Sequence, residues 1–371
     1  MMSRARECFS RADAAPPPAG PREAAQDATP CTPPGRAALS TAKRPHTRVS
    51  CGGEHAGHMP LERSPLPLVP AADARLAGIP VRTERYHRVR RGIYADAAAW
   101  TALSPWDRYA ARVAAFHQRH PDAILCLESA AVAHDLPTFG EPRDIHVFDP
   151  DRAASRRFGD VCVHTAVDGR ETTTLGGVAA TTRDDTALDL IRVLPIGYGL
   201  AVADAALRAG ALREDLMDRA AAQRSQRGKR RLRWTLPRAD AASESAGESI
   251  SRAGMEVGGF ERPELQVVFT YEGVTDRVDF SFRSIRVLGE SDGWGKYDLS
   301  DPAAAERHLR NEKRREDRLR RHGHGFARWE YRDACSVTPM ARALVAAGVH
   351  PRYPASPALA ATLTRNPRSL R

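Results

Sequence analysis

The sequence predicts an α/β protein, with a mixed sheet flanked by helices in its C-terminal part, a smaller α+β region before it and a disordered N-terminal tail. Three observations predict this fold class. Apolar and polar residues alternate along residues 277–288, which is typical of two half-buried strands in a hairpin. A long charged helical stretch at 303–322 precedes a further strand at 326–331. Residues 1–58 contain almost no large aliphatic side chain. An α/β core covered on both faces agrees with this order of elements.

The leader, residues 1–58, is rich in Ala, Pro, Arg and Gly. It cannot bury enough apolar surface to offset its chain entropy, so we expect it to be disordered. Met59 opens a more ordinary sequence, and we expect it to be the true start, with the leader an artefact of gene prediction. An intact mass of native protein that begins at Met1 would contradict this.

Composition favours a polyanionic partner such as nucleic acid. The 371 residues can hold two modest cores, and their net charge is +10. The cations are nearly all Arg, which in a chain rich in Ala and Pro partly reflects a GC-rich genome. The charge is therefore a weaker guide to nucleic acid than in an ordinary sequence.

Cysteine usage and hydropathy predict a cytoplasmic protein without a membrane segment. No apolar run reaches the ~18–20 residues of a membrane-spanning helix, and no signal-peptide core is present. The cysteines are scattered without a C-x-x-C pair, which indicates neither a zinc site nor a disulfide framework. They are Cys8, Cys31, Cys51, Cys126, Cys162 and Cys335.

Residues 60–100 contain a short helical stretch at 72–76. Residues 86–94 then suggest a basic strand or wing, which ends at Gly92. Arg88, Arg90 and Arg91 alternate there with apolar residues. The arrangement resembles the wing of a degenerate winged helix-turn-helix. A basic surface hairpin that caps the next domain is an equal alternative.

Residues 101–234 predict an α+β domain, with helices at 105–120, 125–134, 186–191, 198–208 and 213–224 and strands at 144–147 and 161–164. His134, His146 and His164 lie on separate elements, so surface or core histidines are expected rather than metal ligands. The Arg-Gly-Ile-Tyr run at 91–94, Ser-Ala-Ala at 129–131 and the helix from Thr182 resemble AbiEi-like antitoxins of type IV toxin–antitoxin systems. The resemblance implies a DNA-binding transcriptional regulator with a cognate toxin.

A basic segment beside Trp234 is a candidate for phosphate contacts, and a solvated linker is the alternative. Its cations are Arg227, Lys229, Arg230, Arg231 and Arg233. Residues 235–243, made of Pro, Ala, Asp and Ser, are expected to form a linker that acts as a hinge between two domains.

The hairpin at 277–292 carries three carboxylates. With a two-residue turn at Arg283 and Ser284, Asp279 lies opposite Leu288, and Glu290 is its diagonal neighbour, roughly 7–8 Å away on the same face. Their oxygens can then converge on one divalent cation, and Asp292 shares the parity of Glu290. A three-residue turn would place Glu290 on the other face, and solvent-facing carboxylates are the alternative.

A further helix is expected from a cap at Ser243 to Val257, with Ile250 and Ala253 buried. Glu248 lies on its other side, one turn before Arg252, where an ion pair between the two is the plain interpretation.

The set formed by this helix, the hairpin and the following basic helix resembles the PD-(D/E)XK nuclease superfamily, and within it the very-short-patch-repair (Vsr-like) endonucleases. The resemblance covers about 240–335, with the domain at 244–335, and implies a restriction-endonuclease-like sheet that hydrolyses phosphodiester bonds with Mg²⁺. Carried over residue by residue, it assigns catalysis to Glu248, Asp279, Glu290 and Lys296, and the metal to Asp279, Glu290 and Asp292. Superfamily members usually have Lys where this chain has Asp292, which leaves the general base in doubt.

The basic helix at 303–322 could lie along a phosphate backbone with Lys313, Arg314, Arg315 and Arg318. Residues 336–371 hold a terminal helix and a Pro-rich tail. Two functions follow: a bacterial DNA-binding protein with a Mg²⁺-dependent endonuclease domain, or a non-enzymatic AbiEi-like regulator that keeps the nuclease fold as a scaffold.

Overall fold

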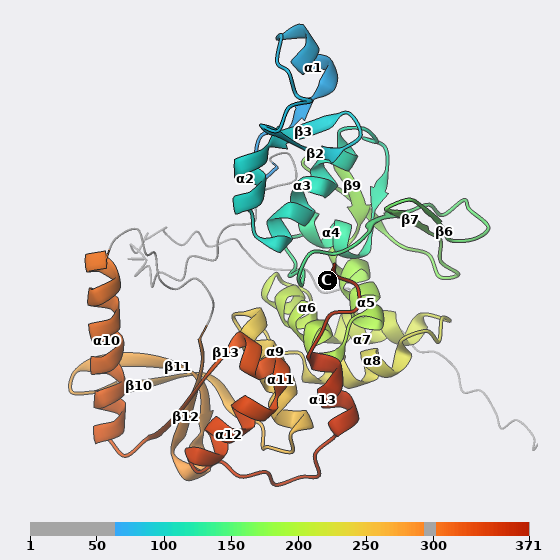
Figure 1. Cartoon of the computed structure of the whole chain (residues 1–371). Coiled ribbons are helices and arrows are strands. Elements are labelled where there is room, and N and C mark those ends of the chain that lie inside the picture. The colour runs from blue at the N-terminus through green and yellow to red at the C-terminus, as the bar shows by residue number, and fades with distance from the viewer. Residues whose placement is uncertain (1–63, 293–301, 371) are drawn as a thin grey trace, which may run out of the picture. The chain divides into compact units, whose positions relative to one another are not determined.

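The computed structural model describes residues 64–292 and 302–370, all of which belong to one compact unit. The predicted α/β class is confirmed: mixed sheets flanked by helices make up the fold (Figure 1). The predictions for residues 1–58, for a start at Met59 and for Lys296 fall outside the described residues.

The first part of the described chain is a three-stranded antiparallel sheet in the order β1-β3-β2, with two short helices. The basic hairpin predicted at 86–94 is β2 and β3, and it turns at Gly92, whose φ is +78°. The elements are β1 (Val69–Pro70), α1 (Ala71–Leu76), β2 (Tyr86–Arg90), β3 (Ile93–Asp96) and α2 (Ala97–Ala102).

The second part is a six-stranded mixed sheet in the order β6-β7-β5-β4-β9-β8, followed by a group of helices. Ser104 and Thr182 accept backbone N–H groups at the starts of α3 and α5, which explains where those helices begin. The strands are β4 (Ile124–Leu125), β5 (Ile145–Phe148), β6 (Arg156–Phe158), β7 (Val161–His164), β8 (Thr172–Leu175) and β9 (Val178–Thr181). The helices are α3 (Pro105–His117), α4 (Leu127–Ala133), α5 (Arg183–Val193), α6 (Ile196–Arg208), α7 (Arg213–Ala222), α8 (Lys229–Thr235) and the 3₁₀ helix η1 (Leu236–Arg238).

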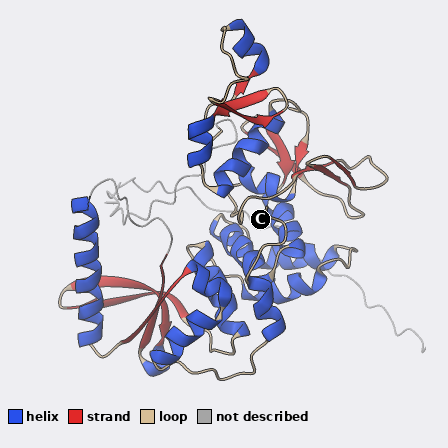
Figure 2. Cartoon of the chain, in the orientation of Figure 1, coloured by secondary structure: helices blue, strands red, loops and turns tan. Residues whose placement is uncertain are grey.

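The third part is a four-stranded sheet in the order β10-β11-β12-β13, in which only β12 and β13 are parallel. Helix α10 covers one face of this sheet, and α9 and α11 lie on the other (Figures 1 and 2). The elements are α9 (Ala246–Val257), β10 (Glu264–Tyr271), β11 (Val274–Phe282), η2 (Arg283–Ile285), β12 (Val287–Asp292), α10 (Pro302–Arg321), β13 (Gly325–Glu330), α11 (Tyr331–Ser336), α12 (Thr338–Ala346) and α13 (Pro357–Leu363).

One hydrophobic core joins the second and third parts, because α6 packs on α9 and their buried side chains belong to the same cluster. The stretch at 235–243 therefore is not an exposed hinge. Thr235, Leu236 and Ser243 are buried, and the Asp240 N–H donates to Asp204 Oδ1 at 2.7 Å. Composition suggested a linker, but tertiary contacts bury this stretch.

The hairpin has a different turn from the one expected. Four residues, 283–286, connect β11 to β12, because η2 and then Arg286 with φ +55° reverse the chain, and Phe282 pairs with Val287. The predicted pairing of Asp279 with Leu288 is therefore wrong, because Leu288 pairs with Ser281. The ladder ends at Phe280 and Gly289, just before the two carboxylates, so the shared face of Asp279 and Glu290 stays a prediction.

A candidate carboxylate site on the four-stranded sheet

Asp279 lies where the ladder between β11 and β12 ends. The last paired residues there are Phe280 and Gly289, whereas β12 continues to pair with β13 as far as Asp292. Asp279 Oδ2 accepts the Ser291 N–H at 3.0 Å, so the side chain fills the place of the next ladder hydrogen bond. This hydrogen bond fixes Asp279 beside the backbone of Ser291, the residue after Glu290.

Glu290 is buried, with 5% of its surface exposed, so it is not an ordinary solvent-facing hairpin residue. Its Oε2 atom lies 2.5 Å from Arg315 Nη2 on α10 and 3.1 Å from Arg328 Nη2 on β13. Glu312 Oε2 contacts the same two guanidinium groups, at 3.1 and 2.9 Å. Three elements therefore meet in one network of two arginines and two carboxylates.

Electrostatics keep the arginines of this network charged. Burial alone would lower the pKa of Arg315, but the hydrogen bond and charge of Glu290, with those of Glu312, raise it above its ordinary value. The pKa of Arg328 is also raised, because nearby Asp292, Glu290 and Glu312 outweigh its burial. Two guanidinium ions therefore neutralise Glu290.

Glu248 is placed by the first turn of α9. The cap of this helix is Ser245, one turn before Glu248, instead of the predicted Ser243. Glu248 Oε2 accepts the Glu244 N–H and Gln266 Nε2, both at 2.9 Å, and Glu248 is 5% exposed. Arg252 pairs with Asp204 at 2.7 Å, so the plain ion pair between Glu248 and Arg252 is not formed.

The described structure does not group the predicted magnesium ligands. Within residues 64–292 and 302–370, no three side chains of the His, Cys, Asp or Glu type are grouped so that they could hold a metal. The expected ligands Asp279, Glu290 and Asp292 are thus not brought together as a set. Nitrogen donors already approach Oε2 of Glu290 and Oε2 of Glu248 at 2.5–3.1 Å, so a hard cation would compete with them for these oxygens.

The predicted phosphate-contacting segment forms most of α8. Gly228, in the left-handed region with φ +70°, precedes this helix. Arg227, Arg230 and Arg233 are exposed and make no ion pair with any described residue, and Lys229 is half-buried. Arg231 is partly engaged, because its Nη1 donates to the Arg192 carbonyl at 2.8 Å. The segment therefore presents a cluster of available cations.

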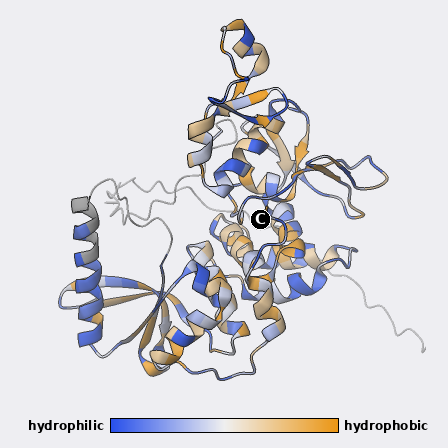
Figure 3. Ribbon diagram, in the orientation of Figure 1, coloured by the Kyte–Doolittle hydropathy of each residue, from blue (hydrophilic) through white to orange (hydrophobic). Residues whose placement is uncertain are grey.

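Some cations of helix α10 face solvent, and others pair with carboxylates of the sheet. Lys313 and Arg314 are exposed without an ion pair in the described part of the chain, on a helix that is mostly hydrophilic over the residues coloured in Figure 3. Arg318 instead pairs with buried Asp276 through two bonds of 2.8 and 2.7 Å, and Arg315 pairs with Glu290. We expected four cations of this helix to contact DNA, but two of them, Arg315 and Arg318, form ion pairs within the protein.

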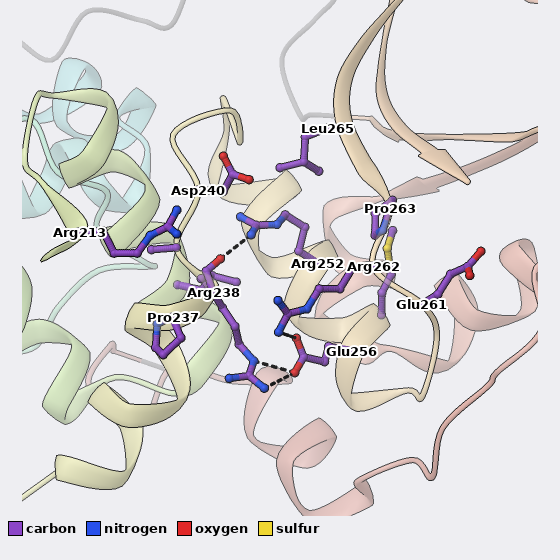
Figure 4. Close-up of a pocket in the computed structure, with 13 residues that line it drawn as sticks. Arg213, Pro237, Arg238, Asp240, Arg252, Glu256, Glu261, Arg262, Pro263 and Leu265 are labelled. Carbon is purple, nitrogen blue, oxygen red and sulfur yellow. Dashed lines mark hydrogen bonds and ion pairs between the residues drawn. The ribbon is translucent and has the colours of Figure 1, made fainter. Parts of the chain in front are cut away.

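A pocket of about 190 Å³ lies among α6, α7, η1, α9 and the start of β10 (Figure 4). Sequence reasoning missed this pocket, because its residues come from five separate segments. Three of its arginines are neutralised, since Arg238 and Arg262 pair with Glu256 and Arg252 pairs with Asp204. The pocket is therefore built mainly from mutually paired charges.

Comparisons with known proteins give relatives without a stated activity. The chain is 35% identical over 170 residues to the uncharacterized proteins MT2308 and Rv2248 of two Mycobacterium tuberculosis strains, CDC 1551 / Oshkosh and H37Rv. The match covers 45% of this chain and 62% of each relative. No protein-family model and no solved structure matches the chain. In the part of the chain that the structure describes, no helix is both long and apolar enough to span a membrane.

Proposed function

We propose that this chain is a DNA-binding protein that acts without cleaving DNA, and that its nuclease-like sheet serves as a scaffold. The observation that carries the proposal is the state of Glu290, whose carboxylate is neutralised by Arg315 and Arg328. A nuclease of the kind the sequence resembles needs that carboxylate for a metal ion. In this arrangement the guanidinium groups supply the positive charge instead.

Exposed cations supply the binding surface. Arg227, Arg230 and Arg233 on and before α8, with Lys313 and Arg314 on α10, make no ion pair among the described residues. Lysine and arginine side chains in this state release counterions from DNA when they contact phosphates, which supports affinity that depends on salt and little on sequence. Binding of this kind fits the antitoxin-like regulator suggested by residues 91–94 and 182–190.

Such a regulator would work in the cytoplasm with a cognate toxin as its partner. This part of the proposal rests on the resemblance of residues 60–234 to AbiEi-like antitoxins.

A magnesium-dependent endonuclease is the second candidate, and the number of carboxylates near the end of the β11–β12 ladder favours it. Asp279 Oδ2 accepts the N–H of Ser291, the residue after Glu290, and Gln266 on β10 donates to Glu248. Carboxylates also outnumber the two arginines here, because Asp292 and Glu316 lie close to Arg328. An excess of negative charge attracts divalent cations.

One experiment separates the two candidates. The full-length chain and Glu290→Ala are incubated with supercoiled plasmid and single-stranded DNA in Mg²⁺, Mn²⁺ or EDTA, and duplex binding is followed by fluorescence anisotropy. We expect equal, salt-sensitive binding by both proteins in EDTA and no cutting in either metal. Cutting that requires metal and disappears in Glu290→Ala would overturn the proposal and establish the endonuclease.

A further inference from the structure

The end of the chain pairs with a distant loop of the second part. The Arg143 N–H donates to the Arg368 carbonyl at 3.0 Å, and the Leu370 N–H donates to the Glu141 carbonyl at 2.7 Å. Between them, Pro142 and Ser369 form an antiparallel bridge. The tail thus pairs with this loop through backbone hydrogen bonds, as extended peptides do when they bind along a protein backbone.

Arg368 anchors the tail to buried side chains. Its guanidinium group reaches both carboxylate oxygens of Glu128, with Nη2 2.7 Å from Oε2, and the same nitrogen lies 3.0 Å from His146 Nε2. His146 Nδ1 in turn lies 2.9 Å from His164 Nε2. Glu128 is only 2% exposed, so Arg368 is its principal counter-charge.

Arg368 also controls the protonation of Glu128. Burial alone would raise the pKa of this carboxyl, but the hydrogen bonds and charge of Arg368 bring it below its ordinary value. Glu128 is therefore ionised when the tail is bound. An arginine fits this requirement, because its planar fork contacts both carboxylate oxygens at once.

The loop at 139–143 lies close to the tail. Gly140 has φ +68°, and a Cβ atom there would lie 2.9 Å from Ser369 Cβ. Asn366 Nδ2 donates to the Phe139 carbonyl at 2.9 Å. Leu370 is 48% exposed, so polar contacts hold the tail more than apolar burial does. Release of the tail would therefore expose little apolar surface, and its main cost would be the loss of Arg368 from Glu128.

We propose that residues 139–143, with the buried pair Glu128 and His146, form a peptide-binding site that reads one arginine, and that the chain's own C-terminal tail occupies it reversibly. The bound tail fastens the segment after α13 to the six-stranded sheet. The site is distinct from the carboxylate site and from the cations of α8, so it stands or falls independently of the proposed function.

The test uses the full-length chain and a labelled peptide of residues 366–371, Asn-Pro-Arg-Ser-Leu-Arg. In the Arg368→Gln chain the internal competitor is weakened, so this chain should bind the peptide more tightly than the wild type. A peptide with Gln in place of Arg368 should bind at least ~30-fold more weakly, the usual loss when one partner of a buried charge pair is removed. A Leu370→Ala peptide, the matched control, should bind within about threefold of the original.

A second measurement does not depend on a variant that might misfold. In the wild-type chain, excess peptide should displace the tail and speed its removal by carboxypeptidase, whereas the Gln peptide should not. Equal binding of the Arg and Gln peptides, or digestion that neither peptide changes, would overturn the proposal.

Discussion

At the level of single residues, buried charged side chains of this protein are neutralised by its own side chains of opposite charge. The side chains of Glu290 and Arg315 are 6% and 16% exposed. Each charge is therefore stabilised by the other side chain more than by water. Removal of one partner from a buried pair leaves the other charge without compensation.

Arg315→Gln should lower the free energy of unfolding by roughly 2–4 kcal/mol, because Glu290 and Glu312 would then share only Arg328. Urea denaturation followed by circular dichroism measures this. The matched control is Arg314→Gln on the same helix, an exposed residue without an ion pair in the described chain, for which a change within about 0.5 kcal/mol is expected. Equal effects of the two substitutions would contradict the network.

His146 should make stability depend on pH. Burial lowers its pKa from 6.5 to about 4, although Glu128 opposes this. Between these values the unfolded chain binds a proton that the folded chain does not, so the free energy of unfolding falls as the pH falls from 7 to 4.5, by about 2–3 kcal/mol from this residue. His146→Gln should flatten that dependence in urea titrations. The exposed His350→Gln control should retain the wild-type slope.

At the scale of elements, the position of α8 depends on a glycine. Gly228 has φ +70°, and a Cβ atom there would lie 2.3 Å from the Arg192 carbonyl oxygen. Arg192 holds the preceding loop through the carbonyls of Ser225 and Arg227, at 3.2 and 2.5 Å. The exposed cations are therefore displayed by a tightly packed start of the helix.

Gly228→Ala should destabilise the chain by about 1–3 kcal/mol more than Gly210→Ala, the usual range for an overpacked contact. Gly210 also has positive φ, +98°, but nothing lies within 4 Å of its Cβ position. Gly210→Ala therefore measures only the cost of placing an alanine at positive φ, which is about 1–2 kcal/mol. Urea unfolding of both variants measures the difference. Gly228→Ala should also weaken DNA binding, and an unchanged affinity would separate α8 from the binding surface.

Local periodicity predicted most elements of this fold. The helices at 105–117, 183–193, 196–208 and 302–321 and the strand at 325–330 fall within a few residues of their expected positions. The register of the hairpin could not be predicted, because it depends on Arg286 adopting φ +55° in a four-residue connection. The ladder ends before Asp279 and Glu290, so their predicted shared face stays a prediction.

The contacts of the site depend on partners that are distant in sequence. Arg315 and Arg318 looked like free cations of a basic helix, but they meet Glu290 and Asp276, which lie 25 and 42 residues away. The pairing of Arg368 with Glu128 spans 240 residues. Residue type and spacing carry no signal for such pairs, because only tertiary packing brings the strands and the tail together.

At the scale of the whole molecule, the shared core makes the second and third parts one cooperative unit. Side chains from α4, α5 and α6 belong to the same buried cluster as those from α9, β11 and β13. We therefore expect residues 64–371 to unfold in a single transition, with tryptophan fluorescence and circular dichroism coinciding in urea. Two separated transitions would indicate the hinged domains that composition suggested.

We propose that exposed arginines around α8 bind the DNA backbone. The dependence of DNA affinity on salt concentration tests this proposal. Affinity for a short duplex is measured in EDTA between 50 and 200 mM KCl. The triple variant Arg227→Gln, Arg230→Gln, Arg233→Gln should reduce the slope of log K against log [salt] by about three. In a control variant with the same loss of charge, Gln replaces Arg75, Arg156 and Arg342, which are exposed residues on other elements. This variant should change the slope little. Equal slopes for the two triple variants would contradict the claim.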